Sequence, residues 1–164
     1  MAQRAGQSGQ NGRVMEWEWV LVNGERRRLR TGFTTGACAA AATKGALSTL
    51  IRQEPVYETQ ICLPVGVRVS FELAELHFDR ESARAAVIKD GGDDPDATHG
   101  AKIFATVSWM KEPGLVIDGG EGVGRVTKPG LAVPVGEAAI NPVPRKMIRQ
   151  AVEELVDLSR CGVQ

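Results

Sequence analysis

The stretch that limits the fold most is GFTTGACAAAATKGALSTLIR, which covers residues 32–52 and combines length with very small side chains. Alanine has the highest helix propensity, and Thr34 or Thr35 can cap a helix that begins near Gly36. Because the side chains stay small over several turns, this helix can lie very close to a sheet or to a ligand. Its free N–H groups and the two threonine hydroxyls could bind an anion, and capping with tight packing is the competing interpretation.

Apolar residues that alternate with polar ones predict a series of short strands on either side of this helix. The predicted strands cover residues 17–22, 57–63, 67–73, 76–78, 85–88, 102–109 and 115–117. Their hairpin-like connections favour an α+β fold over a regular alternation of strands and helices. The sequence therefore predicts a mixed or antiparallel sheet packed by the alanine-rich N-terminal helix and by a C-terminal helix.

The C-terminal helix is predicted to begin at Asn141 and Pro142, which suit the N-cap and the first helical position. Gly162 is expected to end it. One apolar stripe follows this helix and consists of Val143, Met147, Ala151 and Leu155.

Composition narrows the class of protein. The chain has 164 residues, 43% of them apolar, which is enough for one domain with a core. Its formal net charge is zero, which argues against nucleic acid or an acidic membrane as the partner. The sequence shows no signal peptide and no long apolar span, so a cytoplasmic protein is expected. Cys38, Cys62 and Cys161 form no CxxC pair, and reduced, structural thiols are expected.

Residues 1–28 are expected to form a variable, partly disordered extension, because the chain starts with a polar segment rich in Gly and Gln. A basic run at residues 26–30 follows an Asn23-Gly24 turn and could contact phosphate or carboxylate groups. No aromatic platform accompanies this run in the sequence, which favours a solvated strand end.

The loop KDGGDDPDATHG, residues 89–100, concentrates acidic side chains. It does not match a calcium loop of the EF-hand type, because counting from Asp90 places Pro95 at the sixth position and Ala101 at the twelfth. A zinc site needs several Cys or His ligands, and His99 is the one such residue in this loop. No metal site is therefore predicted here.

Acid/base chemistry or polar recognition suits the same loop better. Asp93 and Asp94 are adjacent, and neighbouring carboxylates repel, which can raise the pKa of one of them. Lys89 and His99 bring opposing charge. The alternative is a solvated acidic turn in which Asp96 caps a short helix.

A third motif, DGGEGVGRVTKPG at residues 118–130, matches neither GxGxxG nor the phosphate loop of nucleotide-binding proteins. Gly122 and Gly124 then indicate turns or a close approach of backbone to a bulky group. Arg125 and Lys128 can bind anionic groups.

Taken together, three stretches closely resemble the CbiD family, the cobalt-precorrin-5B C1-methyltransferases of anaerobic cobalamin biosynthesis. They are LRTGFTTGACAAAATKGAL, AVIKDGGDDPDATHGAKI and IDGGEGVGRVTKPGLAVPVGEAAINPVPRKMIRQAV. The resemblance covers about residues 29–158. It departs from the family at Ala37, where threonine is frequent, and at Gly91, where alanine is frequent.

The resemblance implies transfer of a methyl group from S-adenosylmethionine to C1 of cobalt-precorrin-5B, giving cobalt-precorrin-6A. It implies no metal held by the protein, since the substrate carries the cobalt. Residues 29–164 are expected to be the N-terminal portion of such a methyltransferase, whose C-terminal part is absent. A non-catalytic fragment that binds a tetrapyrrole or a partner is the alternative, and a C-terminal partner chain or a homo-oligomer is possible on either interpretation.

The site residues expected from the resemblance and the motifs fall into two groups. The catalytic candidates are Asp93, Asp94 and His99. The candidates for binding substrate or S-adenosylmethionine are Thr34, Thr35, Gly36, Lys89, Asp90, Asp96, Gly122, Gly124, Arg125, Lys128, Arg145 and Lys146.

Overall fold

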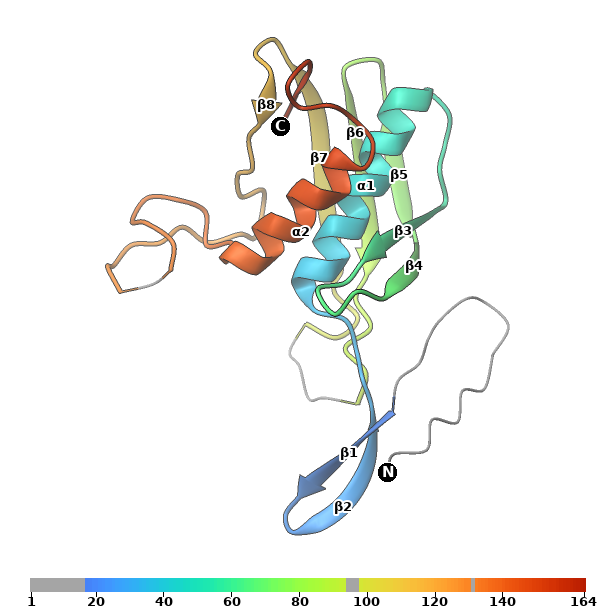
Figure 1. Ribbon diagram of the computed structural model, residues 1–164, viewed down its shortest axis with the longest axis vertical. Coiled ribbons are helices and arrows are strands. Elements are labelled where there is room, and N and C mark those ends of the chain that lie inside the picture. Colours follow the sequence, from blue (N-terminus) through green and yellow to red (C-terminus); the bar gives the residue numbers. More distant parts are fainter. Residues whose placement is uncertain (1–16, 94–97, 131) are drawn as a thin grey trace.

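The computed structural model describes residues 17–93, 98–130 and 132–164. Its helices and strands are α1 (Thr35–Arg52), α2 (Pro142–Glu153), β1 (Trp17–Val22), β2 (Glu25–Arg30), β3 (Glu58–Cys62), β4 (Arg68–Glu72), β5 (Glu75–Phe78), β6 (Ser82–Ile88), β7 (Lys102–Met110), β8 (Gly114–Leu115) and β9 (Gly162–Val163) (Figure 1). The predicted α+β class is confirmed.

The first described residues form the β1–β2 hairpin, which projects from the body below the start of α1 (Figure 1). Asn23 and Gly24 form its two-residue turn, with φ angles of 52° and 83°. Positive φ at both positions suits the type I′ turn, whose twist matches that of the flanking strands. This turn fixes the register, so that Trp17 lies opposite Arg30.

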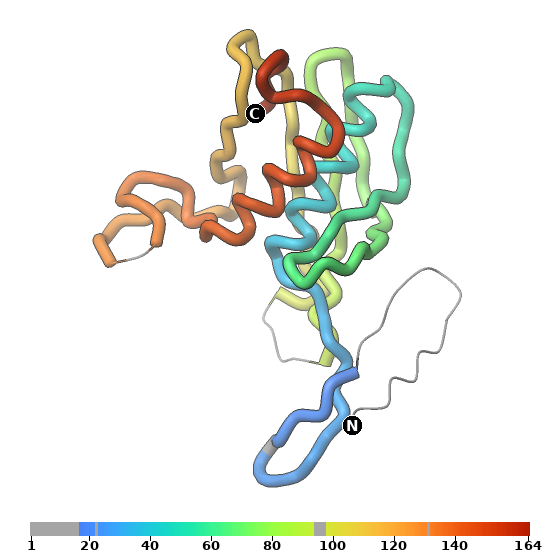
Figure 2. Tube along the Cα trace, in the orientation of Figure 1, coloured from blue at the N-terminus to red at the C-terminus, as the bar shows by residue number. Residues whose placement is uncertain are grey.

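A five-stranded sheet in the order β5-β6-β7-β9-β8 forms one layer. Its pairs are antiparallel except for β8 and β9, which run parallel. Helix α1 packs on this sheet, α2 packs on α1, and the β3–β4 hairpin lies beside the first half of α1 (Figures 1 and 2). The core therefore surrounds α1.

Small side chains explain why α1 can be enclosed on several sides. Ala40, Ala41 and Ala42 are fully buried. A Cβ atom at Gly45 would lie 2.5 Å from Cδ1 of Leu73, so the helix touches its neighbour there without a side chain of its own. This agrees with the prediction that the helix lies very close to a sheet.

The C-terminal helix is shorter than predicted. α2 ends at Glu153 with Glu154 as its C-cap, and Gly162 lies in β9, paired with Met110 of β7. The prediction that Gly162 ends the helix was therefore wrong, because residues after Glu154 turn back to complete the sheet, a tertiary pairing that helical periodicity does not contain. Asn141 is the N-cap as predicted, but its side chain makes no capping hydrogen bond.

The apolar stripe of α2 is only partly buried. Met147 and Ala151 lie in the core, whereas Val143 is 58% exposed. The strand predicted at residues 115–117 is limited to Gly114–Leu115. Within the described residues, neither helix is long and apolar enough to span a membrane.

Candidate functional site

The start of α1 is organised by Thr34, one of the two threonines predicted as a cap. Its Oγ1 accepts a hydrogen bond from the N–H of Ala37 at 3.1 Å, and its carbonyl accepts one from Cys38 at 3.1 Å. The N–H groups of Thr35 and Gly36 donate to no acceptor in the described part of the chain. Unsatisfied N–H groups at a helix N-terminus favour an anion, both as donors and through the helix dipole.

The acidic loop docks directly against this helix start. The N–H of Phe33 donates to the carbonyl of Asp90 at 2.7 Å, and Thr31 forms a β-bridge with Gly92. The contact is so close that a Cβ atom at Gly32 would lie 1.9 Å from the carbonyl carbon of Gly91. Two motifs about sixty residues apart in the sequence therefore form one surface, which we call the polar corner (residues 30–36, 89–93, 98 and 99).

A bidentate ion pair holds the polar corner together. Arg30 donates from Nη1 and Nη2 to the two carboxylate oxygens of Asp90, at 2.5 and 2.7 Å. Both side chains are about four-fifths buried, at 22% and 21% exposure. The hydrogen bond to Asp90 raises the pKa of Arg30, so the guanidinium stays charged.

Asp93 and His99 close the corner. Oδ2 of Asp93 accepts a hydrogen bond from the Arg30 N–H at 2.7 Å, and the Asp93 N–H donates to the Arg30 carbonyl at 2.9 Å. Nδ1 of His99 accepts from the N–H of Gly91 at 3.0 Å. The ring proton of a neutral His99 therefore sits on Nε2, which makes this side chain a donor on its half-exposed side. Asp94 and Asp96 lie outside the described residues.

Lys89 is buried beneath the loop, at 2% exposure. A Cβ atom at Gly91 would lie 3.5 Å from its Nζ, which places the ammonium under that glycine. Cys38 of α1 lies close by: burial raises the pKa of its thiol to about 11, and the nearby charge of Lys89 acts in the opposite direction. A buried lysine is stable only when its charge is compensated, and Lys89 does interact with other groups.

The glycine-rich segment at residues 118–140 forms a second group, fastened by two arginines. Arg125 donates to Oδ2 of Asp118 at 2.9 Å and to the carbonyl of Gly136 at 3.2 Å. This contact lowers the pKa of the Asp118 carboxyl. Arg145 of α2 donates to several acceptors of the segment and its flanks, namely the carbonyls of Ile140, Ala138 and Ile117 and the carboxylate of Glu137.

The two groups adjoin through the first turns of the helices. A Cβ atom at Gly36 would lie 2.8 Å from Cγ of Pro144, so the start of α1 touches the start of α2 directly before Arg145. Gly122 and Gly124 are exposed within the segment. Lys128 and Lys146 are also exposed, and neither makes a hydrogen bond or ion pair with a described residue.

Sequence reasoning missed two features of this region. Arg30, the partner of Asp90, was grouped with the basic run and not with the site. The expectation that no aromatic platform accompanies the basic run was wrong, because Trp17 and Trp19 lie opposite Arg30 and Arg28 in the hairpin register. The Asn-Gly turn contained the signal, since a two-residue loop fixes which residues face each other.

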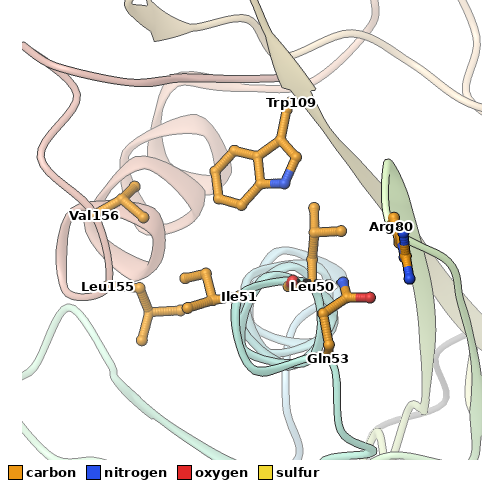
Figure 3. Close-up of a pocket in the computed structure, with 7 residues that line it drawn as sticks. All are labelled: Leu50, Ile51, Gln53, Arg80, Trp109, Leu155 and Val156. Atoms are coloured by element: carbon orange, nitrogen blue, oxygen red, sulfur yellow. Dashed lines mark hydrogen bonds between the residues drawn. The ribbon is translucent and has the colours of Figure 1, made fainter.

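A pocket of 690 Å³ lies elsewhere, at the end of α1 (Figure 3). It is lined by Leu50, Ile51, Gln53, Arg80, Trp109, Leu155 and Val156. Sixteen residues of helix separate Leu50 from Thr34, which is about 24 Å along the axis. None of the predicted site residues lines this pocket, whereas Arg145 does line a smaller hollow of 320 Å³ beside the glycine-rich segment.

The fold and the site define an α+β domain whose buried, alanine-rich helix begins at a polar corner rich in glycine and paired charges. The chain belongs to the CbiD family, whose sequence model matches residues 22–164. The predicted family membership is thereby confirmed.

Curated relatives support the assignment. The cobalt-precorrin-5B C(1)-methyltransferase of Geobacillus kaustophilus is 65% identical over 131 residues, which are 80% of this chain and 35% of that protein. The enzyme of the same name from Salinispora arenicola is 55% identical over 136 residues, covering 83% and 36%. This chain thus spans about a third of the length of the relatives it matches.

A solved structure also matches. The crystal structure of the cobalamin biosynthesis protein (cbiD) from Archaeoglobus fulgidus aligns with a TM-score of 0.55 and 27% sequence identity. The alignment covers 85% of this chain and 44% of that one.

Proposed function

We propose that this chain takes part, in the cytoplasm, in the S-adenosylmethionine-dependent methylation of C1 of cobalt-precorrin-5B, giving cobalt-precorrin-6A in anaerobic cobalamin biosynthesis. One observation carries the proposal: a relative named for this reaction is 65% identical to this chain over 131 residues. The family match also covers the whole polar corner.

The donor groups at the start of α1 fit the carboxylate of S-adenosylmethionine. Thr35 and Gly36 offer two N–H groups without a described acceptor, and the Thr35 hydroxyl is exposed beside them. When bound, S-adenosylmethionine supplies a methyl group activated by its sulfonium. Thr34 holds the helix start in place by capping it. These residues bind and orient, and orientation accounts for most of the catalysis in a direct methyl transfer.

The substrate is a broad ring that carries cobalt and several carboxylate arms. Lys128 and Lys146 are exposed and unpaired within the described residues, so both can reach such an arm. Arg125 is exposed although it pairs with Asp118. A Cβ atom at Gly122 or Gly124 would meet nothing within 4 Å, so the ring can approach the backbone there. Arg145 acts mainly by holding this segment against α2.

The acidic loop supplies polar and proton-handling groups. We assign His99 the role of a donor through Nε2, because Nδ1 is occupied by the Gly91 N–H. Asp93 and Asp94 are the candidates for moving a proton on the ring. Lys89 and Asp90 contribute a positive and a negative charge to the corner. Asp96 is a further binding candidate in the same loop.

A binding portion without catalysis of its own is the second candidate. It is favoured by the chain's match to 35% of the Geobacillus kaustophilus enzyme, which leaves most of that enzyme without a counterpart here. A partner chain or a second copy of this chain would then complete the site.

A transfer assay separates these candidates. The purified chain is mixed with cobalt-precorrin-5B and methyl-labelled S-adenosylmethionine, alone and with the unmatched C-terminal portion of the Geobacillus kaustophilus relative. The proposal predicts label on the tetrapyrrole in at least one mixture, and a loss of about a hundredfold in the Asp93→Asn, His99→Ala double variant. Arg27→Gln is the control, because this exposed arginine pairs with Glu25 on the hairpin. Binding without transfer in both mixtures supports the second candidate, and absence of binding contradicts both.

A further inference from the structure

The β1–β2 hairpin has two unlike faces. Directly opposed residues of an antiparallel pair share a face, and so do residues two apart on one strand. One face consists of Trp17, Trp19, Leu21, Arg26, Arg28 and Arg30, which we call the Trp/Arg face. The two glutamates of the hairpin, Glu18 and Glu25, lie on the opposite face with Arg27.

The Trp/Arg face is exposed and basic. Trp19 and Leu21 are 69% and 71% exposed, and Trp17 is 46% exposed. The guanidinium of Arg28 lies over the ring of Trp17, 5.2 Å from its centroid. Among the described residues no carboxylate pairs with Arg26 or Arg28. Large aromatic side chains left in water beside unpaired arginines mark a binding surface.

This face leads directly into the polar corner. Its last member, Arg30, forms the bidentate ion pair with Asp90. The Asp93 carboxylate accepts a hydrogen bond from the Arg30 N–H, and the Asp93 N–H donates one to the Arg30 carbonyl. These contacts fix the base of the hairpin to the acidic loop. The hairpin therefore projects away from the body directly before the start of α1 (Figure 2).

We propose that the Trp/Arg face is a binding surface for a flat, conjugated ring with carboxylate arms, the chemical class of the tetrapyrrole substrate. The inference rests on the proposed function, which supplies the ligand. Tryptophan rings stack on a conjugated plane, and arginines bind carboxylates in a bidentate manner. An uncharged apolar partner would leave the arginines without counter-charges, whereas a polycarboxylate ring satisfies both halves of the face.

The test uses cobalt(III) uroporphyrin, an octacarboxylate, and measures its binding to the 164-residue chain by equilibrium dialysis. The Trp19→Ala, Arg28→Gln double variant is expected to bind it about tenfold more weakly or worse, from one lost stacking contact and one lost ion pair. The matched control is Val20→Ala, Arg27→Gln, which changes the neighbouring opposed pair on the other face, and a change below about twofold is expected. A cationic cobalt pyridinium porphyrin is expected not to bind.

A second readout needs no variant. Bound uroporphyrin is expected to slow the modification of Arg26 and Arg28 by phenylglyoxal in the wild-type chain at least about fivefold, and to leave Arg27 unchanged. This keeps the test decisive if the double variant fails to fold.

The outcomes separate this inference from the proposed function. If the hairpin variant and its control bind uroporphyrin equally, the proposed role of the Trp/Arg face is refuted. If His99→Ala weakens binding in that case, the proposed site stands. If the wild-type chain binds no uroporphyrin, both are refuted. If the Trp/Arg face binds oligothymidylate in preference to uroporphyrin, its partner is nucleic acid and the inference is overturned.

Discussion

At the scale of single residues, the polar corner depends on glycines, because residues without side chains let two backbone segments touch. Gly32 and Gly91 meet backbone to backbone, and Gly92 adopts a φ of 67°, in the region that favours glycine. This contact lets the acidic loop reach the start of α1, where Asp90 and Asp93 bind Arg30.

Substituting Gly32 tests this contact. Gly32→Ala is expected to lower the free energy of unfolding by about 1–3 kcal/mol or more, because the new methyl group would overlap the Gly91 backbone. Gly120→Ala is the matched control: no atom lies within 4 Å of its Cβ position, and a change within about 1 kcal/mol is expected. Urea denaturation measures both. Equal effects would show that the two loops do not touch as described.

The thiol of Cys38 gives a second test at this scale. Burial raises its pKa to about 11, from an ordinary value of 9.0, so near neutral pH its thiolate fraction is lower by about two orders of magnitude than that of an ordinary thiol. Cys62 and Cys161 are only partly buried. A disulfide reagent should therefore modify two thiols quickly and Cys38 far more slowly in the native chain. Three equally fast thiols would contradict this placement.

The raised pKa also has a consequence for stability. The folded state favours the neutral thiol, so its contribution is fully present below the unfolded pKa and is lost as pH rises from about 9 toward about 11. In Cys38→Ala this part of the alkaline loss of stability should disappear.

Part of the site at residue level followed from the sequence. A cap at Thr34 or Thr35 was expected, because threonine has narrow uses in turns and caps, and Thr34 makes it. The contact between the acidic loop and this helix start was not predicted. The Arg30–Asp90 pair could not be predicted, because sixty residues separate the partners. The sequence alone also does not show which arginine of the basic run reaches the loop.

At the scale of elements, α1 links the core to the site. Its alanines pack in the core, while its first turn leaves two N–H groups beside the acidic loop. The cap is what fixes this turn.

Removing the cap should therefore weaken the helix. Thr34→Ala is expected to cost about 1 kcal/mol of unfolding free energy, because the Ala37 N–H loses its acceptor. Thr34→Ser should retain most of it. Asn141→Ala is the comparison at α2, where the side chain makes no capping hydrogen bond, and a smaller loss is expected. Thermal unfolding of the three variants measures this, and an equal loss at Thr34 and Asn141 would argue against the cap.

Alternation and turn residues located most strands to within a few residues. The end of α2 and the place of Gly162 were not predictable, because β9 exists only through its pairing with β7 and β8. Two-residue strands carry no periodic signal of their own.

At the scale of the whole molecule, α1 has two unlike ends. The polar corner lies at its start, and the pocket with Trp109 lies at its other end (Figure 3). The proposed function requires the first end to meet the ligand, although the larger pocket lies at the second.

One measurement tests that claim most directly. Amide spectra of the chain are recorded while paramagnetic cobalt(II) uroporphyrin is added, since the metal broadens signals of nearby groups. We expect the amides of Thr35, Gly36, Gly91 and His99 to broaden, with those of Gln53 and Trp109 unchanged. Broadening of Gln53 and Trp109 while the four corner amides stay sharp would contradict the account.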